Sequence, residues 1–243
     1  MVKRDRADRL LVARGVFESR ARAQAAIAAG QVTADGSLVR KPSDQISSAA
    51  VIAADPAHPY VSRGGVKLAA ALESFSLDVA GRVCLDVGSS TGGFTEVLLE
   101  RGARHVYAVD VGRRQLHARL LNCEQVTSIE QTDIRKLDPS RLPELPDFAA
   151  VDVSFISLKL VLPHVGSLLK PSATLLALIK PQFEAGRRHI KKGIVRDTVL
   201  QSAICDDLAR ALTGLGWRVD GCIPSPIPGG DGNREFFIGA QRG

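Results

Sequence analysis

The stretch that decides the fold is Val83–Phe94, with the sequence VCLDVGSSTGGF. It begins as an apolar run typical of a buried strand, reaches a carboxylate at Asp86, and then turns through Gly88, Gly92 and Gly93. Glycine permits backbone conformations and close approaches that other residues resist. In a doubly wound α/β sheet, ligands bind beyond the carboxyl ends of the strands, where such a turn lies. We therefore expect this turn to hold a nucleotide-like cofactor.

Short apolar runs alternate with helical patterns from about residue 80 onward. This alternation predicts an α/β fold with a doubly wound, Rossmann-like sheet and helices on both faces. The predicted strands lie within 82–89, 105–111, 147–155, 174–183, 217–223 and 234–241. The predicted helices lie within 95–102, 113–121, 158–169 and 198–216.

Residues 1–60 have a different character, and we expect them to form a small α+β domain. Seven basic residues and three acidic ones lie between Lys3 and Arg22. Ser19 is a suitable N-cap for a second helix that Gly30 would end, and Asp35-Gly36 predicts a hairpin turn. The predicted division is residues 1–60 as a first domain, 61–79 as a linker and helix with Lys67, and 80–243 as the large domain.

Composition narrows the class of protein. The chain has 243 residues, a formal net charge of +6 and a pI near 9.4, which permits a nucleic-acid partner without requiring one. It has no apolar run long enough to span a membrane and no apolar segment typical of a secretory signal, so we expect a cytoplasmic protein. The four cysteines are widely spaced without a CxxC pair, so we expect neither a metal site nor a disulfide framework.

The glycine turn departs from two well-known nucleotide motifs. A dinucleotide fingerprint would have glycine where Ser90 stands, and a P-loop would need a Gly-Lys-Ser/Thr sequence that is absent. The remaining pattern, D-x-G-x-x-x-G, resembles the first motif of class I S-adenosylmethionine-dependent methyltransferases. Asp110 ends the next strand, where a carboxylate accepts hydrogen bonds from ribose hydroxyls. Taken singly, Asp86 and Asp110 are better explained as residues that cap loops, and it is their joint placement at the strand ends that favours a cofactor site.

The resemblance implies S-adenosylmethionine as the cofactor, with the adenine amino group near Asp133. The candidate cofactor-binding residues are Asp86, Gly88, Ser89, Ser90, Thr91, Gly92, Gly93, Phe94, Asp110, Val111, Asp133 and Ile134.

Four charged residues stand out as candidates for the chemistry. Asp152 and Lys180 each follow a predicted strand, Glu235 opens the last one, and Lys67 precedes the first strand. A lone charged side chain is usually solvated, but Lys180 directly follows a buried apolar run, where a charge is costly without a reason. A suitably placed lysine can take the proton of a ribose hydroxyl while carboxylates orient it.

In order, Lys67, Asp152, Lys180 and Glu235 are similar to the Lys-Asp-Lys-Glu tetrad of FtsJ-like ribose 2′-O-methyltransferases. The chain as a whole resembles the haemolysin-A-like (TlyA) family, which joins such a domain to an αL-type RNA-binding domain. The matching stretches are DRLLVARGVFESRARAQAAIAAGQVTADGSLVRKP, VSRGGVKL, LDVGSSTGGFT, VDVSFISL, IKPQFEAG and GNREFF. The resemblance implies methylation of a cytidine 2′-hydroxyl in ribosomal RNA, whereas the residue pattern alone indicates only an RNA ribose.

Basic residues on both domains are candidates for phosphate contacts. They are Arg4, Arg6, Arg9, Arg20, Arg22, Lys41, Arg63, Arg187, Arg188, Lys191 and Lys192. The short termini favour the large ribosomal subunit as the partner. Two other functions stay open: a non-catalytic RNA-binding or ribosome-assembly factor, which the tetrad disfavours, and a membrane-active haemolysin, which the absence of a spanning or long amphipathic segment disfavours.

Overall fold

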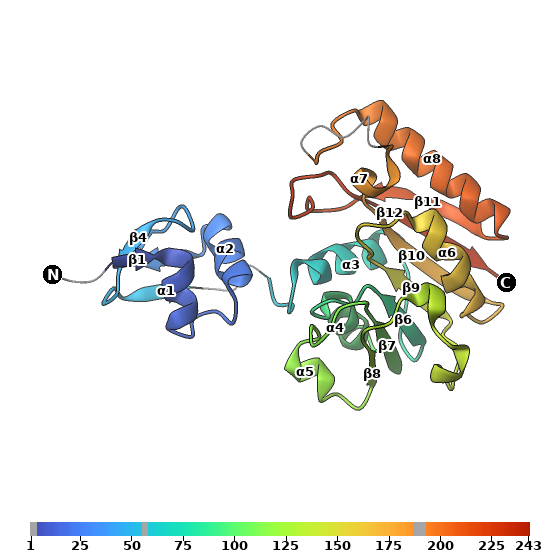
Figure 1. Cartoon of the computed structure of the whole chain (residues 1–243), viewed down its shortest axis with the longest axis horizontal. Coiled ribbons are helices and arrows are strands. Elements are labelled where there is room, and N and C mark those ends of the chain that lie inside the picture. Colours follow the sequence, from blue (N-terminus) through green and yellow to red (C-terminus); the bar gives the residue numbers. More distant parts are fainter. Residues whose placement is uncertain (1–3, 55–57, 187–192) are drawn as a thin grey trace. The chain divides into compact units, whose positions relative to one another are not determined.

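The computed structural model describes residues 4–54, 58–186 and 193–243 of the chain. The chain divides into two compact units, Met1–Pro59 and Tyr60–Gly243 (Figure 1). The predicted α/β fold, with a Rossmann-like sheet and a small N-terminal α+β region, is confirmed. The helix carrying Lys67 belongs to the second unit.

The N-terminal unit packs two short helices against two small antiparallel sheets. Strands β1 and β4 form one sheet and β3, β2 and β5 form the other. In chain order the elements are β1 (Arg4–Arg6), α1 (Ala7–Ala13), α2 (Arg20–Ala28), β2 (Val32–Ala34), β3 (Ser37–Leu38), β4 (Gln45–Ser47) and β5 (Ile52–Ala54).

Local signals in the sequence explain this unit. The Ser19 hydroxyl accepts a hydrogen bond from the Arg22 N–H at the start of α2, as an N-cap does. Asp35 and Gly36 both have positive φ between β2 and β3, the backbone that a two-residue type I′ hairpin requires. Leu11, Ile27 and other buried apolar residues of both helices and both sheets share one core.

The second unit is built on a seven-stranded sheet of order β11-β12-β10-β9-β6-β7-β8. All neighbouring pairs from β10 to β8 are parallel, while β12 runs antiparallel to β10 and β11. The strands are β6 (Val83–Val87), β7 (His105–Val109), β8 (Val126–Ile129), β9 (Phe148–Val151), β10 (Ala173–Ile179), β11 (Arg218–Pro224) and β12 (Phe236–Arg242).

Helices cover both faces of this sheet (Figure 1). One face packs against α6 and α8 in a core that includes Leu162 and Leu208, and the other packs against α3 and α4 in a core that includes Leu72 and Leu98. The helices are α3 (Arg63–Ser74), α4 (Gly93–Glu100), α5 (Ala118–Leu121), α6 (Leu158–Ser167), α7 (Pro181–Glu184) and α8 (Thr198–Gly214), with 3₁₀ turns η1 (Ile134–Lys136) and η2 (Pro139–Arg141).

One predicted helix is shorter than expected. Residues 113–121 were predicted to be helical, but α5 covers only Ala118–Leu121. The Glu130 carboxylate accepts hydrogen bonds from the backbone N–H groups of Arg114, Gln115 and Leu116, and Arg114 has a φ of 53°. These tertiary bonds hold the segment in a loop, and a helical repeat in the sequence cannot reveal them.

Candidate active site

A cavity of about 470 Å³ opens at the carboxyl edge of the parallel strands. Its volume lies in the range of sites for small molecules and cofactors. Six of the predicted cofactor-binding residues line it: Gly88, Ser90, Asp110, Val111, Asp133 and Ile134. Asp152, Ser154 and Phe155 line it as well.

Asp86 lies at the end of β6 and is fully buried. One oxygen, Oδ2, accepts a hydrogen bond from the Thr95 hydroxyl at 2.6 Å, while Oδ1 has no hydrogen-bond partner within the described part of the chain. Burial raises the pKa of Asp86 to about 7, although the Thr95 hydrogen bond opposes this shift. A buried carboxylate oxygen without a partner fits a cofactor that brings a cationic or hydrogen-bond-donating group.

Asp110 holds the glycine turn in place from the neighbouring strand. Its Oδ2 accepts the Ser90 N–H at 2.8 Å, and its Oδ1 accepts the Gly112 N–H at 2.6 Å. Each carboxylate oxygen can accept a further hydrogen bond, so ribose hydroxyls can still bind here. Asp110 therefore shapes the cavity wall and offers acceptors at the same time.

The glycines of the turn are required by the packing of the chain itself. A Cβ on Gly88 would lie 2.2 Å from the Asp152 carbonyl oxygen, and one on Gly93 would lie 2.1 Å from the Ser62 hydroxyl. Gly92 has a φ of 96° and packs against Leu120. Gly92, Gly93 and the buried Phe94 thus hold the turn in place through their packing. The predicted cofactor residues that lie outside the cavity lining are Asp86, Ser89, Thr91, Gly92, Gly93 and Phe94.

Asp133 is already engaged by a neighbouring arginine. Its carboxylate accepts hydrogen bonds from the Arg135 side chain at 2.6–3.2 Å and from the Arg135 N–H at 3.0 Å. The Arg135 guanidinium lowers the pKa of Asp133 to about 2. The carboxylate therefore lines the cavity as a fixed anion that can accept a hydrogen bond from an amino group.

Lys180 lies beside the cavity, where it contacts two residues of the cavity lining. Its Nζ lies 2.5 Å from Asp152 Oδ1 and donates a hydrogen bond to Ser154 Oγ at 2.8 Å. The side chain is only 13 % exposed. The lysine is therefore held in a fixed position where β9 and β10 end.

Lys67 and Glu235 form a second, deeply buried ion pair. Their Nζ and Oε2 atoms lie 2.5 Å apart, and the carboxylate is 3 % exposed. The last β10–β12 pair is Ile179 with Phe236, so the antiparallel register places Lys180 opposite Glu235, one residue beyond it. The structure thus brings the four predicted charged residues to one edge of the sheet as two lysine–carboxylate pairs.

Phe155 is a feature of the site that the sequence analysis missed. Its side chain is 90 % exposed beside the cavity, and its φ of 65° is costly for a non-glycine residue. The Phe183 ring, on α7, lies 5.0 Å from it. The Glu184 carboxylate ties the two segments together, since it accepts hydrogen bonds from the Ser157 hydroxyl and the Leu158 N–H at 2.6 and 2.7 Å. The sequence holds one sign of this feature, which is the aromatic residue three positions after Asp152.

The predicted RNA-contacting residues have different environments. Arg6 and Arg20 both bind the fully buried carboxylate of Asp8, at 3.0 and 2.6 Å, and Gln24 also donates to it. Arg4 donates to the Gln45 carbonyl, Arg22 pairs with Glu18 at 3.6 Å, and Arg63 donates to the Pro228 carbonyl. Arg9 and Lys41 are exposed, while Arg187, Arg188, Lys191 and Lys192 lie outside the described residues.

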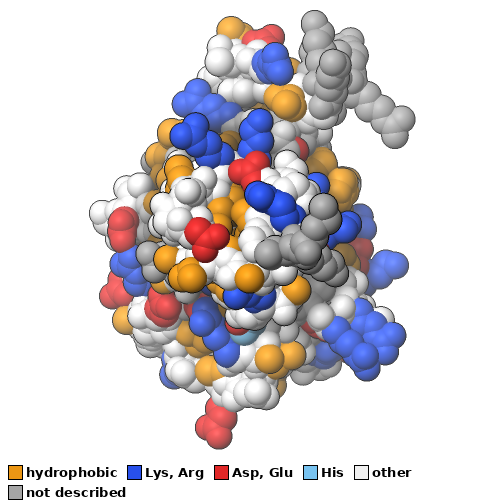
Figure 2. Space-filling model, turned by 90° about the vertical axis from the view of Figure 1, so that its left-hand side faces the viewer, with side chains coloured by type: hydrophobic (Ala, Val, Ile, Leu, Met, Phe, Trp, Pro, Cys, Tyr) orange, Lys and Arg blue, Asp and Glu red, His pale blue; other side chains and the backbone are white. Residues whose placement is uncertain are grey.

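Figure 2 shows Lys and Arg side chains spread over the face in view rather than gathered into one patch.

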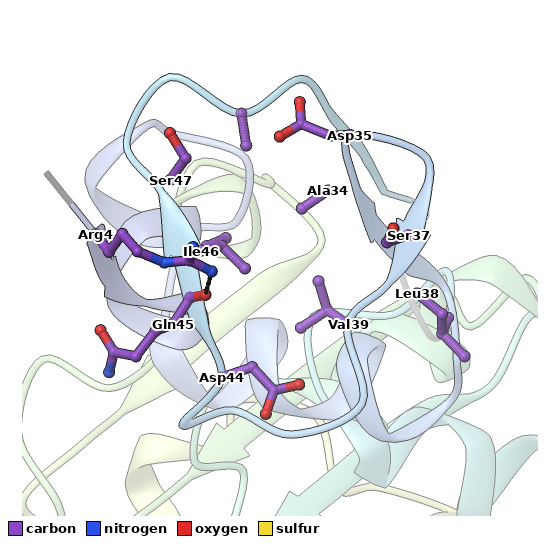
Figure 3. Close-up of a pocket in the computed structure, with 11 residues that line it drawn as sticks. Arg4, Ala34, Asp35, Ser37, Leu38, Val39, Asp44, Gln45, Ile46 and Ser47 are labelled. Carbon is purple, nitrogen blue, oxygen red and sulfur yellow. Dashed lines mark hydrogen bonds between the residues drawn. The ribbon is translucent and has the colours of Figure 1, made fainter. Parts of the chain in front are cut away.

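A hollow of about 510 Å³ also lies in the N-terminal unit, with the apolar side chains of Ala34, Val39 and Ile46 inside it (Figure 3). Although this hollow is slightly larger than the cavity beside Asp110, Asp35 and Asp44 on its lining disfavour an anionic ligand.

No cluster of three or more His, Cys, Asp or Glu side chains suited to a metal ion is found among residues 4–54, 58–186 and 193–243. Within the same ranges, every helix is too short or too polar to span a membrane.

Comparisons with known proteins agree with this geometry. The FtsJ-like methyltransferase model matches residues 60–242, and the S4 domain model matches residues 5–52. The 16S/23S rRNA (cytidine-2′-O)-methyltransferase TlyA of Mycobacterium tuberculosis is 44% identical over 241 residues, which cover 98% of this chain and 90% of the relative.

Solved structures show the same relationship. A protein from Streptococcus thermophilus, described provisionally as a hemolysin, is 40% identical with a TM-score of 0.79, over 100% of this chain and 90% of that one. The magnesium protoporphyrin IX methyltransferase of Synechocystis, solved with bound S-adenosylmethionine, has a TM-score of 0.51 at 17% identity, over 74% and 79% of the two chains, and shows the fold alone. The chain therefore belongs to the FtsJ-like methyltransferases and, with its S4 domain, to the haemolysin-A-like (TlyA) family.

Proposed function

We propose that this protein transfers a methyl group from S-adenosylmethionine to the 2′-hydroxyl of a cytidine ribose in ribosomal RNA. The observation that carries the proposal is that two lysine–carboxylate pairs lie at the edge of the sheet where a cofactor-sized cavity opens, with Asp152 of one pair lining that cavity. The relative from Mycobacterium tuberculosis, whose name states this reaction, supports the choice of substrate. A ribosomal substrate places the protein in the cytoplasm.

The cavity residues fit the proposed cofactor. Asp110 would accept hydrogen bonds from its ribose and Asp133 one from its adenine amino group, and both residues line the cavity. Asp86 is buried just before the glycine turn, outside the cavity lining, and its Oδ1 has no hydrogen-bond partner in the described part of the chain. When bound, S-adenosylmethionine supplies an electrophilic methyl group on a sulfonium centre. The chain's own task is to orient the acceptor hydroxyl and remove its proton.

We assign to Lys180 the removal of the proton from the acceptor 2′-hydroxyl. Asp152 and Ser154 hold its Nζ at the cavity edge, where the cofactor's reactive end and the ribose can meet. Lys67 adds positive charge that stabilises the developing alkoxide, and Glu235 holds Lys67 in position. Such fixed charges help because they need no reorganisation during the reaction.

The exposed Phe155 ring suits the base of the acceptor nucleotide. A cytosine must leave its stacked position before its ribose can enter the site, and an aromatic side chain compensates part of the lost stacking. Base–aromatic stacking contributes about 1–3 kcal/mol per base. The strained backbone at Phe155 is consistent with a functional role for the ring.

The test is incubation with methyl-labelled S-adenosylmethionine and separated ribosomal subunits from a strain that lacks the modification. Ribose-methylation mapping then locates the product, and we expect it on a cytidine of the large subunit. Cofactor binding without methyl transfer to either subunit would support the alternative of a non-catalytic assembly factor. The Asp110→Ala variant provides a control, because losing ribose hydrogen bonds should weaken cofactor binding by about 1–3 kcal/mol.

A further inference from the structure

Cys205 and Cys222 meet in the second unit, and neither belongs to the lining of the cavity beside Asp110. Cys205 lies on α8 and Cys222 on β11, and their sulfurs are 2.9 Å apart. The Cys222 thiol donates a hydrogen bond to the Cys205 sulfur. Cys205 is buried against the core and Cys222 is exposed, so the pair combines a packed thiol with an accessible one.

A β-bulge in β11 produces this contact. Val219 pairs with Ala240 and Gly221 pairs with Gly239, so Asp220 is an additional residue between two consecutive pairs. Because a bulge reverses the alternation of side chains, Cys222 faces the same side of the sheet as Val219. Its β12 partner, Ile238, packs in the core beneath α6 and α8, whereas Ile223 on β11 packs against the opposite core. Without the bulge, Cys222 would point away from α8.

We propose that Cys205 and Cys222 form a reversible intramolecular disulfide when the protein meets a peroxide. The Cys205 thiolate attacks hydrogen peroxide and becomes a sulfenic acid as hydroxide leaves. The Cys222 thiol then attacks the sulfenic sulfur, and water leaves as the S–S bond forms. In sum, two thiols and one hydrogen peroxide give one disulfide and two waters. The sulfurs need to approach by about 0.9 Å to reach bonding distance.

The surroundings of the pair favour this reaction over oxidation elsewhere. A hollow of about 400 Å³ is lined by both cysteines, which gives a small oxidant access to the pair. The hydrogen bond from Cys222 lowers the pKa of Cys205, and the same bond raises the pKa of Cys222. By contrast, burial raises the pKa of Cys84 to about 12, so this thiol is a poor nucleophile.

The full-length protein is treated with one equivalent of hydrogen peroxide, denatured, labelled with N-ethylmaleimide and digested with trypsin under non-reducing conditions. Cleavage after Arg196, Arg210, Arg218 and Arg234 separates the two cysteines into peptides 197–210 and 219–234. We expect these peptides to be recovered linked, with Cys84 and Cys123 still labelled. Dithiothreitol should restore all four labels. The oxidised protein should also melt about 5 °C higher, because the new bond closes a 17-residue loop.

The Cys123→Ser variant is the matched control and should form the linked peptides at the wild-type rate. In Cys222→Ser, the link should disappear and the sulfenic acid of Cys205, left without its resolving thiol, should be trapped as a dimedone adduct. The proposal is overturned if wild-type protein loses the Cys123 label as fast as the Cys222 label. It is equally overturned if wild-type protein consumes the peroxide without forming the linked peptides.

Discussion

At the scale of single residues, Lys180 carries the most specific expectation. Lys180→Ala should reduce single-turnover methyl transfer to rRNA by at least about 10³-fold, because it removes the group assigned to the ribose proton. Cofactor affinity should change little, since Lys180 pairs with Asp152 and Ser154 and is not itself part of the cavity lining. Calorimetry with S-adenosylmethionine and rapid-quench methylation assays measure the two effects separately.

The Lys180→Arg variant tests whether Lys180 acts as a base or only as a fixed positive charge. Arginine keeps the positive charge but stays protonated near neutral pH, so it cannot accept the proton. We expect it to be nearly as inactive as the alanine variant, with unchanged circular dichroism as the folding control. Substantial methylation by Lys180→Arg would reduce Lys180 to a fixed positive charge and remove its role as a base.

Asp86 should make the stability of the cofactor-free protein depend on pH. Its pKa is about 7 in the folded protein, against 3.8 for an ordinary aspartate, so the folded state holds the proton more tightly. The free energy of unfolding should therefore fall as pH rises from 4 to 7 and then level off. Asp86→Asn removes this dependence and should be more stable than wild type at pH 8, by on the order of 4 kcal/mol.

Urea unfolding of wild type and Asp86→Asn at pH 4, 6 and 8 provides the measurement. The same substitution should weaken S-adenosylmethionine binding, since Asp86 lies just before the turn whose Gly88 and Ser90 line the cavity. An equal pH dependence in both proteins would show that Asp86 is ionised throughout this range in the folded state.

At the scale of elements, Asp8 joins the two helices of the N-terminal unit. Its buried carboxylate on α1 binds Arg6, Arg20 and Gln24, and the two guanidiniums lower its pKa well below the usual range. Its contribution to stability is present above pH 4 and is lost only as pH falls through the lowered value. Asp8→Asn should destabilise this unit by about 2 kcal/mol, because hydrogen bonds to a charged group are lost.

The same change should weaken RNA binding, because Arg6 and Arg20 would no longer be held side by side. Limited proteolysis of the N-terminal unit and filter binding to rRNA fragments test both effects. Glu18→Gln is the matched control, since Glu18 is 63 % exposed and pairs with Arg22 at 3.6 Å. Exposed ion pairs contribute little, so the control should behave as wild type. RNA binding by Asp8→Asn with the wild-type affinity would show that Arg6 and Arg20 bind RNA without being held by Asp8.

The sequence predicts elements well where a local signal decides them. The Ser19 cap, the Asp35-Gly36 turn and the strand before Asp86 all depend on neighbouring residues. Predictions fail where a distant partner decides, as with the loop that Glu130 holds through three backbone N–H groups. The charged residues of the site were identifiable because each lies beside a strand end, but their pairing depends on sheet order.

The role of the turn glycines and of Phe155 was beyond such reasoning. The sequence suggests that Gly88 and Gly93 make room for a ligand. In the structure, however, a Cβ atom on either residue would collide with another part of the chain itself. Phe155 reads as one more apolar residue in a run, and only the fold reveals that its ring is exposed beside the cavity. Close backbone approach and side-chain exposure are properties of the folded chain.

At the scale of the whole molecule, the two units have separate cores, so their functions should be separable. A fragment of residues 60–243 retains the complete sheet and every charged residue of the proposed active site. We expect it to bind S-adenosylmethionine with an affinity within about threefold of the full chain, a difference of about 0.6 kcal/mol, since every residue of the cavity lining lies in the fragment. Its affinity for rRNA should fall sharply, because Arg6, Arg20 and their neighbours are gone.

Salt dependence distinguishes lost phosphate contacts from a damaged fold. Each phosphate neutralised by Lys or Arg adds about 0.7–0.9 to the slope of log affinity against log salt. The full chain should therefore show a steep slope, and the fragment a slope smaller by at least about 1.4–1.8, for the contacts of Arg6 and Arg20. Filter binding at several salt concentrations, with calorimetry of the cofactor as the folding control, gives both numbers. A fragment that methylates ribosomal subunits at the full-length rate would contradict the assignment of RNA binding to the N-terminal unit, because recognition would then reside entirely in residues 60–243.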